Sequence, residues 1–162
     1  ATDDLAVVPY NLLDEKVKLI EETLEVDAVK SSISGCNLIG SLAVANSNGI
    51  VVSPHVLDRE VKQFEELGVN VESTSMVGSD IIGSLITVTN KGFLMDKNAT
   101  ETEVDFARDV FGVEGDIGTV GRGISLVGAC SLANSSGAIV AKESTGPEMA
   151  RVEEALGFLD DL

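Results

Sequence analysis

Apolar runs that end at a polar residue and a glycine recur at nearly constant intervals along this chain. The clearest copy is residues 38–52 (LIGSLAVANSNGIVV), where two glycines nine positions apart bracket a mostly apolar run. The same spacing gives three glycine pairs: Gly40 and Gly49, Gly83 and Gly92, and Gly128 and Gly137. Successive copies are offset by 43 and 45 residues. A period of this length indicates an array of similar supersecondary units.

Each copy predicts a β-hairpin. The dipeptides between its two apolar runs are Asn48-Gly49, Lys91-Gly92 and Ser136-Gly137. Asn-Gly favours a type I′ turn, because glycine adopts a positive φ without steric cost. The first glycine of each pair is expected to let neighbouring strands approach one another closely.

Helical periodicity follows each hairpin. The residues expected to face inward are Leu13, Val17, Ile20 and Leu24; Leu57, Val61, Phe64 and Leu67; Val104, Ala107 and Phe111; and Met149, Val152 and Leu156. Capping boxes are predicted at residues 100–103 and 145–148, and Gly68 is expected to end the second helix. Short strands are predicted after the first three helices, at residues 26–33, 69–71 and 113–120.

The chain therefore divides into four units within a single domain of the mixed α/β (α+β) class. The predicted units are residues 1–33, 34–74, 75–120 and 121–162, and a complete unit contains a strand, a strand, a helix and a strand. The first unit begins on its second strand and the fourth lacks its last strand. Because one unit cannot bury its sheet face alone, we expect the units to stack as an open array or to close into a ring.

Charge and composition limit the classes of partner. Eleven Lys and Arg residues stand against 27 Asp and Glu residues, for a net charge of −16. This balance disfavours direct binding to DNA or another nucleic-acid backbone, and it either favours a basic protein partner or only keeps the protein soluble. No apolar run approaches the roughly 20 residues of a membrane span, and no signal peptide is evident. We therefore predict a cytoplasmic protein without membrane contact.

Catalysis and cofactor binding are not indicated. Cys36 and Cys130 are too few and too far apart in sequence for a disulfide framework or a metal site. The only histidine, His55, follows a proline in a predicted solvated turn, so neither thiol has an evident activating base. Several carboxylates lie on the outward faces of the predicted helices and are expected in solvent: Glu65, Glu66, Asp105, Asp109, Glu153 and Glu154. We predict no enzymatic activity, no metal and no cofactor.

The ordered set of motifs resembles the translation initiation factor 6 family, a ribosome anti-association factor shared by archaea and eukaryotes. Besides the glycine-bracketed hairpins, the motifs are residues 34–40 (SGCNLIG), 88–92 (VTNKG), 116–120 (DIGTV), 145–148 (TGPE) and 153–157 (EEALG). Together they cover essentially the whole chain. The resemblance implies a pentein fold, a ring of five strand-rich units around a pseudo-fivefold axis with the helices outside.

The resemblance also implies a function. The family binds the large ribosomal subunit on its intersubunit face, chiefly through a ribosomal protein near the sarcin-ricin loop, and blocks joining of the small subunit. It is also tied to maturation of the large subunit, and we expect a monomer. The implied contact residues, in the last two units, are Ser84, Leu85, Leu132 and Asn134; alternatively, the two leucines belong only to the core.

Two departures from the family accompany this resemblance. The chain holds four units where the family has five, so we expect the natural protein to be longer, with one more unit of about 44 residues between Glu72 and Ser75 and a strand before Ala1.

An enzyme is the alternative, because other pentein proteins are guanidino-group hydrolases or transferases that use a cysteine nucleophile. That alternative function would require a reactive thiol at Cys36 or Cys130.

Overall fold

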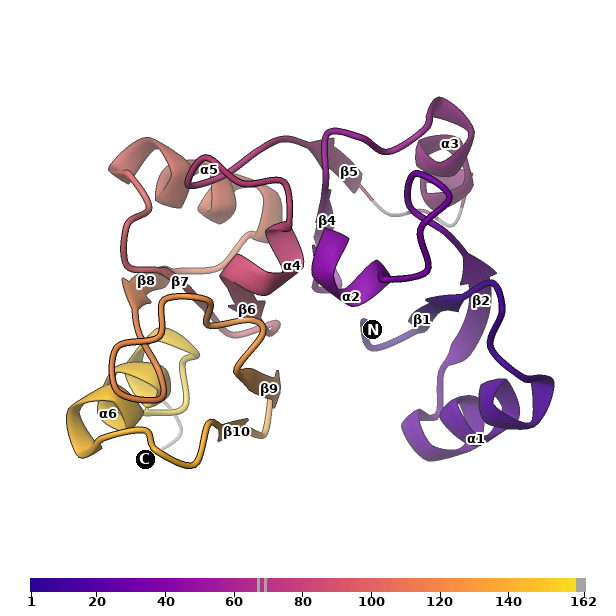
Figure 1. Ribbon diagram of the computed structural model, residues 1–162. Helices are drawn as coiled ribbons and strands as arrows, with labels where there is room; N and C mark the ends of the chain where they lie inside the picture. The colour runs from indigo at the N-terminus through magenta and orange to yellow at the C-terminus, as the bar shows by residue number, and fades with distance from the viewer. Residues whose placement is uncertain (67, 69, 160–162) are drawn as a thin grey trace.

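The computed structural model describes residues 1–66, 68 and 70–159 and shows a mixed α/β protein with several small sheets. Figure 1 shows four groups, each containing strands and a helix, that follow one another along an open arc. The helices α1, α3, α5 and α6 lie on the outside of this arc, and the short helices α2 and α4 lie toward its middle. The predicted unit order is therefore visible in space, whereas the closed ring of five remains a prediction.

The two central units have the predicted order of strand, strand, helix and strand. The second unit contains β3 (Ala43–Ala45), β4 (Gly49–Val52), α3 (Asp58–Glu66) and β5 (Asn70–Ser73). The third contains β6 (Ile86–Val88), β7 (Phe93–Asp96), α5 (Glu101–Phe111) and β8 (Gly115–Gly118). In both, the first two strands pair antiparallel, and the strand after the helix pairs parallel with the middle strand.

Within the described residues, the outer units have two strands each. The first unit contains β1 (Leu5–Pro9), α1 (Asp14–Leu24) and β2 (Asp27–Ser31), and its strands are parallel. The fourth contains β9 (Ser131–Asn134), β10 (Gly137–Val140) and α6 (Gly146–Ala155), and its strands form an antiparallel hairpin. The first unit thus supplies the second and last strands of the repeat, and the fourth supplies the first and second, as the sequence predicts.

Of the first bracketing glycines, Gly83 and Gly128 permit a close approach, but none of the three lies in a strand. Gly40 is in α2 (Ile39–Leu42), and Gly83 is in α4 (Ile82–Leu85); the two helices have the same sequence, IGSL. A Cβ atom on Gly83 would overlap the backbone oxygens of Gly40 and Ala43, and one on Gly128 would overlap the oxygen of Gly83. The glycines therefore let the units meet through their backbones.

The prediction of a positive φ at the second bracketing glycines is wrong. Besides those at helix ends, residues with a positive φ lie in three turns that precede α2, α4 and residues 125–130. These turns, here called the lead-in turns, are Ser34-Gly35, Val77-Gly78 and Gly121-Arg122-Gly123. Gly49 is required for a different reason, since a Cβ atom there would lie 2.7 Å from the oxygen of Val110 in α5. The missing side chain of Gly49 leaves space for the helix of the next unit to pack against the hairpin turn.

A glutamate from the helix of the same unit holds each lead-in turn. The Glu60 carboxylate accepts the N–H of Ser34 at 2.7 Å, Glu103 accepts that of Val77 at 2.6 Å, and Glu148 accepts that of Gly123 at 2.8 Å. Glu103 and Glu148 also complete the predicted capping boxes. One carboxylate therefore satisfies amide donors of both a helix start and a left-handed turn.

The predicted inward faces of the helices are confirmed where a preceding unit covers them. Val104, Ala107 and Phe111 pack with Val51 of the second unit, and Val152 and Leu156 pack with Leu94 of the third. In α1 the predicted buried stripe is wrong: none of its residues is buried, and no other unit covers this helix within the described part of the chain. The exposed members of the predicted faces are Leu13, Leu24, Leu57 and Met149; Leu67 and Val69 lie outside the described residues.

The two IGSL helices offer a matched test of the backbone contact. We expect Gly83→Ala to lower the free energy of unfolding by about 1–3 kcal/mol, because the added methyl group would overlap backbone that cannot move freely. Gly40→Ala meets open space and should be neutral or stabilising by up to about 1 kcal/mol. Urea unfolding followed by circular dichroism measures both, and equal effects would contradict the close approach.

Glu148 gives a pH-dependent prediction. Hydrogen bonds from the backbone of Thr145 and then Gly123 lower the pKa of its carboxyl from the ordinary 4.5 to about 2. Because the folded-state pKa is the lower one, this carboxylate stabilises the fold above pH 4.5, and its contribution is lost as the pH falls toward about 2. Glu148→Gln should therefore be less stable than the parent protein at pH 7, with a difference that shrinks below pH 4.5. A difference independent of pH would contradict this role.

Candidate functional site

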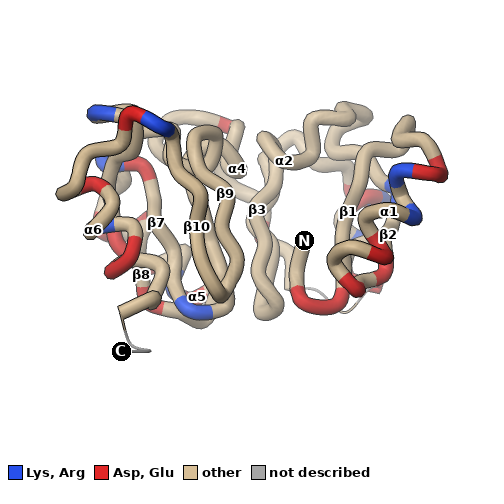
Figure 2. The backbone as a smooth tube through the Cα atoms, turned by 90° about the horizontal axis from the view of Figure 1, so that it is seen from below, with Lys and Arg blue, Asp and Glu red and all other residues tan. Residues whose placement is uncertain are grey.

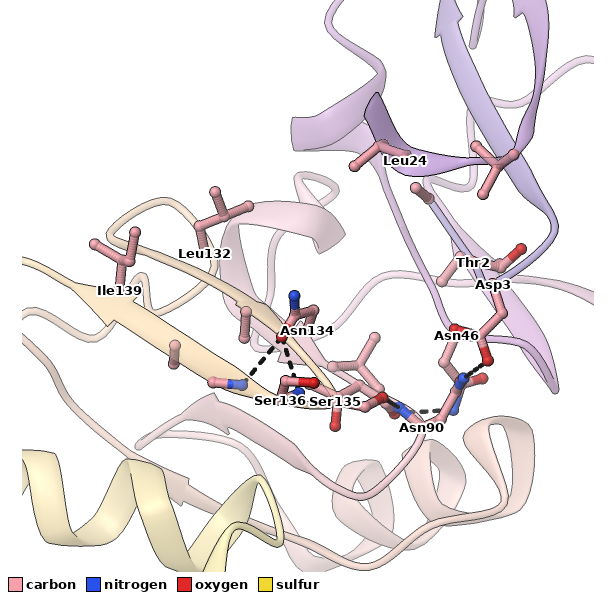
Figure 3. Close-up of a pocket in the computed structure, with 18 residues that line it drawn as sticks. Thr2, Asp3, Leu24, Asn46, Asn90, Leu132, Asn134, Ser135, Ser136 and Ile139 are labelled. Carbon is pink, nitrogen blue, oxygen red and sulfur yellow. Dashed lines mark hydrogen bonds between the residues drawn. The ribbon is translucent and has the colours of Figure 1, made fainter. Parts of the chain in front are cut away.

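A groove of about 780 Å³ lies at the opening of the arc. The hairpin β9–β10 forms one wall, and Leu24 with residues 1–3 lies on the other side (Figure 3). The turns of the hairpins β3–β4 and β6–β7 contribute Asn46 and Asn90. The groove is therefore bordered by every unit of the chain.

Leu132 and Ile139 form an exposed apolar pair on this groove. They are directly opposite one another on β9 and β10, and their exposed fractions are 73% and 74%. The corresponding pair of the third unit is Thr87 and Leu94, and both are buried. A position that is covered within the chain at one unit is thus open at the next, which makes this pair a candidate contact surface.

The four predicted contact residues do not share one environment. Leu132 and Asn134 lie on β9 at the groove. Ser84 and Leu85 are in α4, where they are 7% and 2% exposed, and Leu85 belongs to the core. The alternative expectation, that a leucine of this set is a core residue, therefore holds for Leu85 and not for Leu132.

Asn134 has a local structural role. Its Oδ1 accepts the N–H groups of Ser136 at 2.9 Å and Gly137 at 3.0 Å, closing the turn of its own hairpin. Asn46 closes the β3–β4 turn in the same way, with bonds from Asn48 and Gly49. Ribosome contact by Asn134 stays a prediction, and any such contact would use the part of the side chain that the turn leaves open.

A repeated polar contact links the hairpin turns. The N–H of Asp3 donates to Ser47 Oγ at 3.4 Å, that of Ser47 to Asn90 Oδ1 at 2.9 Å, and that of Asn90 to Ser135 Oγ at 3.4 Å. These four residues occupy equivalent positions in successive units. Sequence reasoning missed them, although their spacing of 43 to 45 residues was the signal that could have found them.

The groove carries little charge. Among the described residues that line it, Asp3 has the only charged side chain, and β3, β9 and β10 contain no Lys, Arg, Asp or Glu. Figure 2 shows the acidic residues instead on the outer helices and on loops. An uncharged surface with an acidic surrounding suits a protein partner that has an apolar contact point and a basic periphery.

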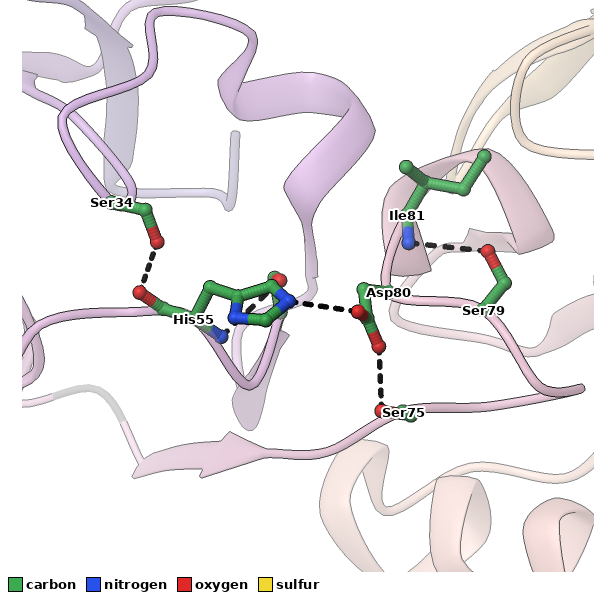
Figure 4. Close-up of polar contacts among 7 residues, drawn as sticks. Ser34, His55, Ser75, Ser79, Asp80 and Ile81 are labelled. Carbon is green, nitrogen blue, oxygen red and sulfur yellow. Dashed lines mark hydrogen bonds and ion pairs between the residues drawn. The ribbon is translucent and has the colours of Figure 1, made fainter.

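Within the described residues, the contacts of His55 are with groups other than a cysteine. His55 Nε2 lies 2.8 Å from Asp80 Oδ2, and Ser75 Oγ donates to Asp80 Oδ1 at 2.6 Å (Figure 4). Nucleophilic catalysis needs the hydroxyl or thiol on the imidazole, whereas here both groups bind the carboxylate. Cys36 Sγ instead accepts the N–H of Leu38 at 3.5 Å.

The described residues form neither a metal site nor, at the turn of residues 121–123, a phosphate site. Within residues 1–66, 68 and 70–159, no group of three or more His, Cys, Asp or Glu side chains is placed to hold a metal ion. The N–H groups of Arg122 and Gly123, which a phosphate loop would direct at its ligand, donate to Glu148. In the same part of the chain no helix has the length and apolar character needed to cross a bilayer.

The two leucines of the predicted contact set can be separated by stability. We expect Leu85→Ala to lower the free energy of unfolding by about 2–5 kcal/mol, because it leaves a cavity in the core. Leu132→Ala should change it by no more than about 0.5 kcal/mol, since that side chain is mostly in solvent. Chemical denaturation distinguishes the two, and a large loss in Leu132→Ala would mean that this side chain is covered in solution.

Comparison with known proteins matches the eIF-6 family at residues 1–68 and 64–155. Translation initiation factor 6 of Methanobrevibacter smithii is 79% identical over 205 positions, covering 100% of this chain and 92% of the relative. The proteins of the same name from Thermococcus onnurineus and Pyrococcus horikoshii are 31% and 30% identical, covering 99% and 98% of this chain and 92% of each relative. The first alignment runs over 43 more positions than the 162 residues of this chain, a number close to one repeat interval. The chain belongs to the eIF-6 family.

Proposed function

We propose that this protein binds the large ribosomal subunit and sterically prevents the small subunit from joining it, with a further role in maturation of the large subunit. The observation that carries the proposal is the family match, which extends over most of the chain, together with relatives named translation initiation factor 6. Steric exclusion makes and breaks no covalent bond. The function therefore requires a body of fixed shape with a binding face and needs no catalytic residues.

The packing supports such a rigid body. Backbone segments of neighbouring units meet at Gly83 and Gly128 without room for a side chain, and glutamates tie the lead-in turns to the helices. A surface that is already ordered loses little conformational entropy on binding. The net charge of −16 favours encounter with a basic ribosomal protein.

We place the apolar centre of the contact at Leu132, with Asn134 beside it on β9. Both side chains are exposed on the groove, and an exposed leucine among uncharged neighbours is typical of a contact that becomes buried on binding. Ser84 and Leu85 would act indirectly. The backbone oxygen of Ser84 accepts the N–H of Ala129 at 3.2 Å. This hydrogen bond ties α4 to the segment just before β9 and so helps to position the strand.

Co-sedimentation and light scattering test the function directly. Purified protein should travel with isolated large subunits through a sucrose gradient and should reduce the rise in scattering when small subunits are added. A heat-unfolded sample provides the control for non-specific adsorption. Equal binding to small subunits, or unchanged subunit joining at saturating protein, would contradict the proposal.

Leu132 provides the test of the contact. We expect Leu132→Ala to speed dissociation from the large subunit by about tenfold, because removal of a central apolar side chain mainly changes the off-rate. The matched control is Leu38→Ala, which truncates a leucine of similar exposure, 68%, that does not line the groove. Surface-captured large subunits allow both rates to be measured. Identical rates for Leu132→Ala and the parent protein would remove Leu132 from the contact.

A further inference from the structure

The turn between β3 and β4 contains the one Asn-Gly pair of the sequence, Asn48-Gly49. Such pairs are chemically labile because glycine leaves its backbone nitrogen unhindered. That nitrogen can attack Cγ of the asparagine: the new N–Cγ bond forms, the Cγ–Nδ2 bond breaks, and ammonia leaves. Water then opens the resulting succinimide to give aspartate or isoaspartate. The reaction needs a free Gly49 nitrogen and a mobile Asn48 side chain.

The fold holds both reacting groups in hydrogen bonds to other residues. The N–H of Gly49 donates to Asn46 Oδ1 at 3.2 Å, and Asn48 Nδ2 donates to the backbone oxygen of Phe111 at 2.7 Å. Asn46 is itself fixed, since it is 2% exposed and its Nδ2 donates to Thr89 and Phe111. The turn can therefore react only after it separates from the third unit.

Conversion of the amide to an acid would prevent the turn from docking again. The oxygen of Phe111 lies at the C-terminal end of α5, where the helix dipole is negative. A carboxylate at position 48 has no proton to donate to this oxygen and would be repelled by it. The packing around Gly49 leaves no room for a shifted turn, because a Cβ atom at position 49 would lie only 2.7 Å from the backbone oxygen of Val110.

We propose that Asn48 is a latent deamidation site which the interface between the second and third units protects, and that its conversion to an acid releases the β3–β4 turn from α5. Deamidation of Asn48 would therefore report opening of this interface, because opening releases the hydrogen bonds of Asn48 Nδ2 and Gly49 N–H and allows an irreversible reaction. The inference does not depend on the proposed ribosomal function.

Peptide mapping by mass spectrometry measures the first part. At mildly alkaline pH we expect Asn48 to deamidate about tenfold or more slowly in the native protein than in the urea-unfolded chain, since reaction requires local opening. Asn46→Ala, which removes the acceptor for Gly49, should speed the reaction at Asn48 in the native state. Asn134→Ala, which removes the equivalent side chain in the β9–β10 turn, should not. Equal native and unfolded rates would overturn the protection. Should Asn46→Ala fail to fold, the deamidation rate of Asn48 in the parent protein can be compared with and without sub-denaturing urea instead.

Direct substitution measures the second part. Asn48→Asp should lower the melting temperature by about 2–4 °C or more, because a charge replaces a hydrogen-bond donor at the interface. Asn37→Asp is the matched control, since it adds the same charge at an exposed asparagine on another turn. An unchanged melting temperature for Asn48→Asp would overturn the proposed release.

Discussion

The structure depends on burial of one side of each hairpin under the helix of the following unit. Val51 is covered by α5, and Leu94 is covered by α6. The short strands of three to five residues have little stability as isolated sheets, so the apolar contact between units supplies what the sheets alone cannot. The exposed α1 stripe and the exposed Leu132–Ile139 pair are the two surfaces at which this contact is not made.

Other features serve this contact by setting the distance between units. Gly49 and Gly83 lack side chains where helix or backbone must approach, and Asn46 reaches across the boundary to the oxygens of Thr89 and Phe111. The lead-in turns then fix where the next short segment begins. Affinity for a large partner would depend on the same spacing, because a shift between units would move β9 relative to the rest of the surface.

The sequence predicts the units well because their signals are local and repeated. The capping boxes at Thr100 and Thr145 and the inward face of α5 depend on neighbouring residues and are confirmed. Exposure of the α1 stripe was not predicted, since it depends on a neighbour that helical periodicity cannot reveal. The turn chemistry was also missed: Gly49 is needed to admit α5, while the left-handed conformations fall on Ser34 and Val77, residue types that do not signal them. At the groove, the sequence could not distinguish exposed Leu132 from buried Leu85, because both follow a bracketing glycine in an apolar run.

The direction of the contact between units has a consequence for synthesis of the chain. The hairpins β3–β4 and β6–β7 are each covered by a helix that comes later in the sequence, so their apolar sides stay exposed until the ribosome has added most of another unit. Val51, for example, meets α5 residues that are made some 50 to 60 positions afterwards. During translation the growing end therefore always presents one uncovered hairpin, a surface open to aggregation or to chaperones, and this exposed surface moves along the chain as each new unit emerges.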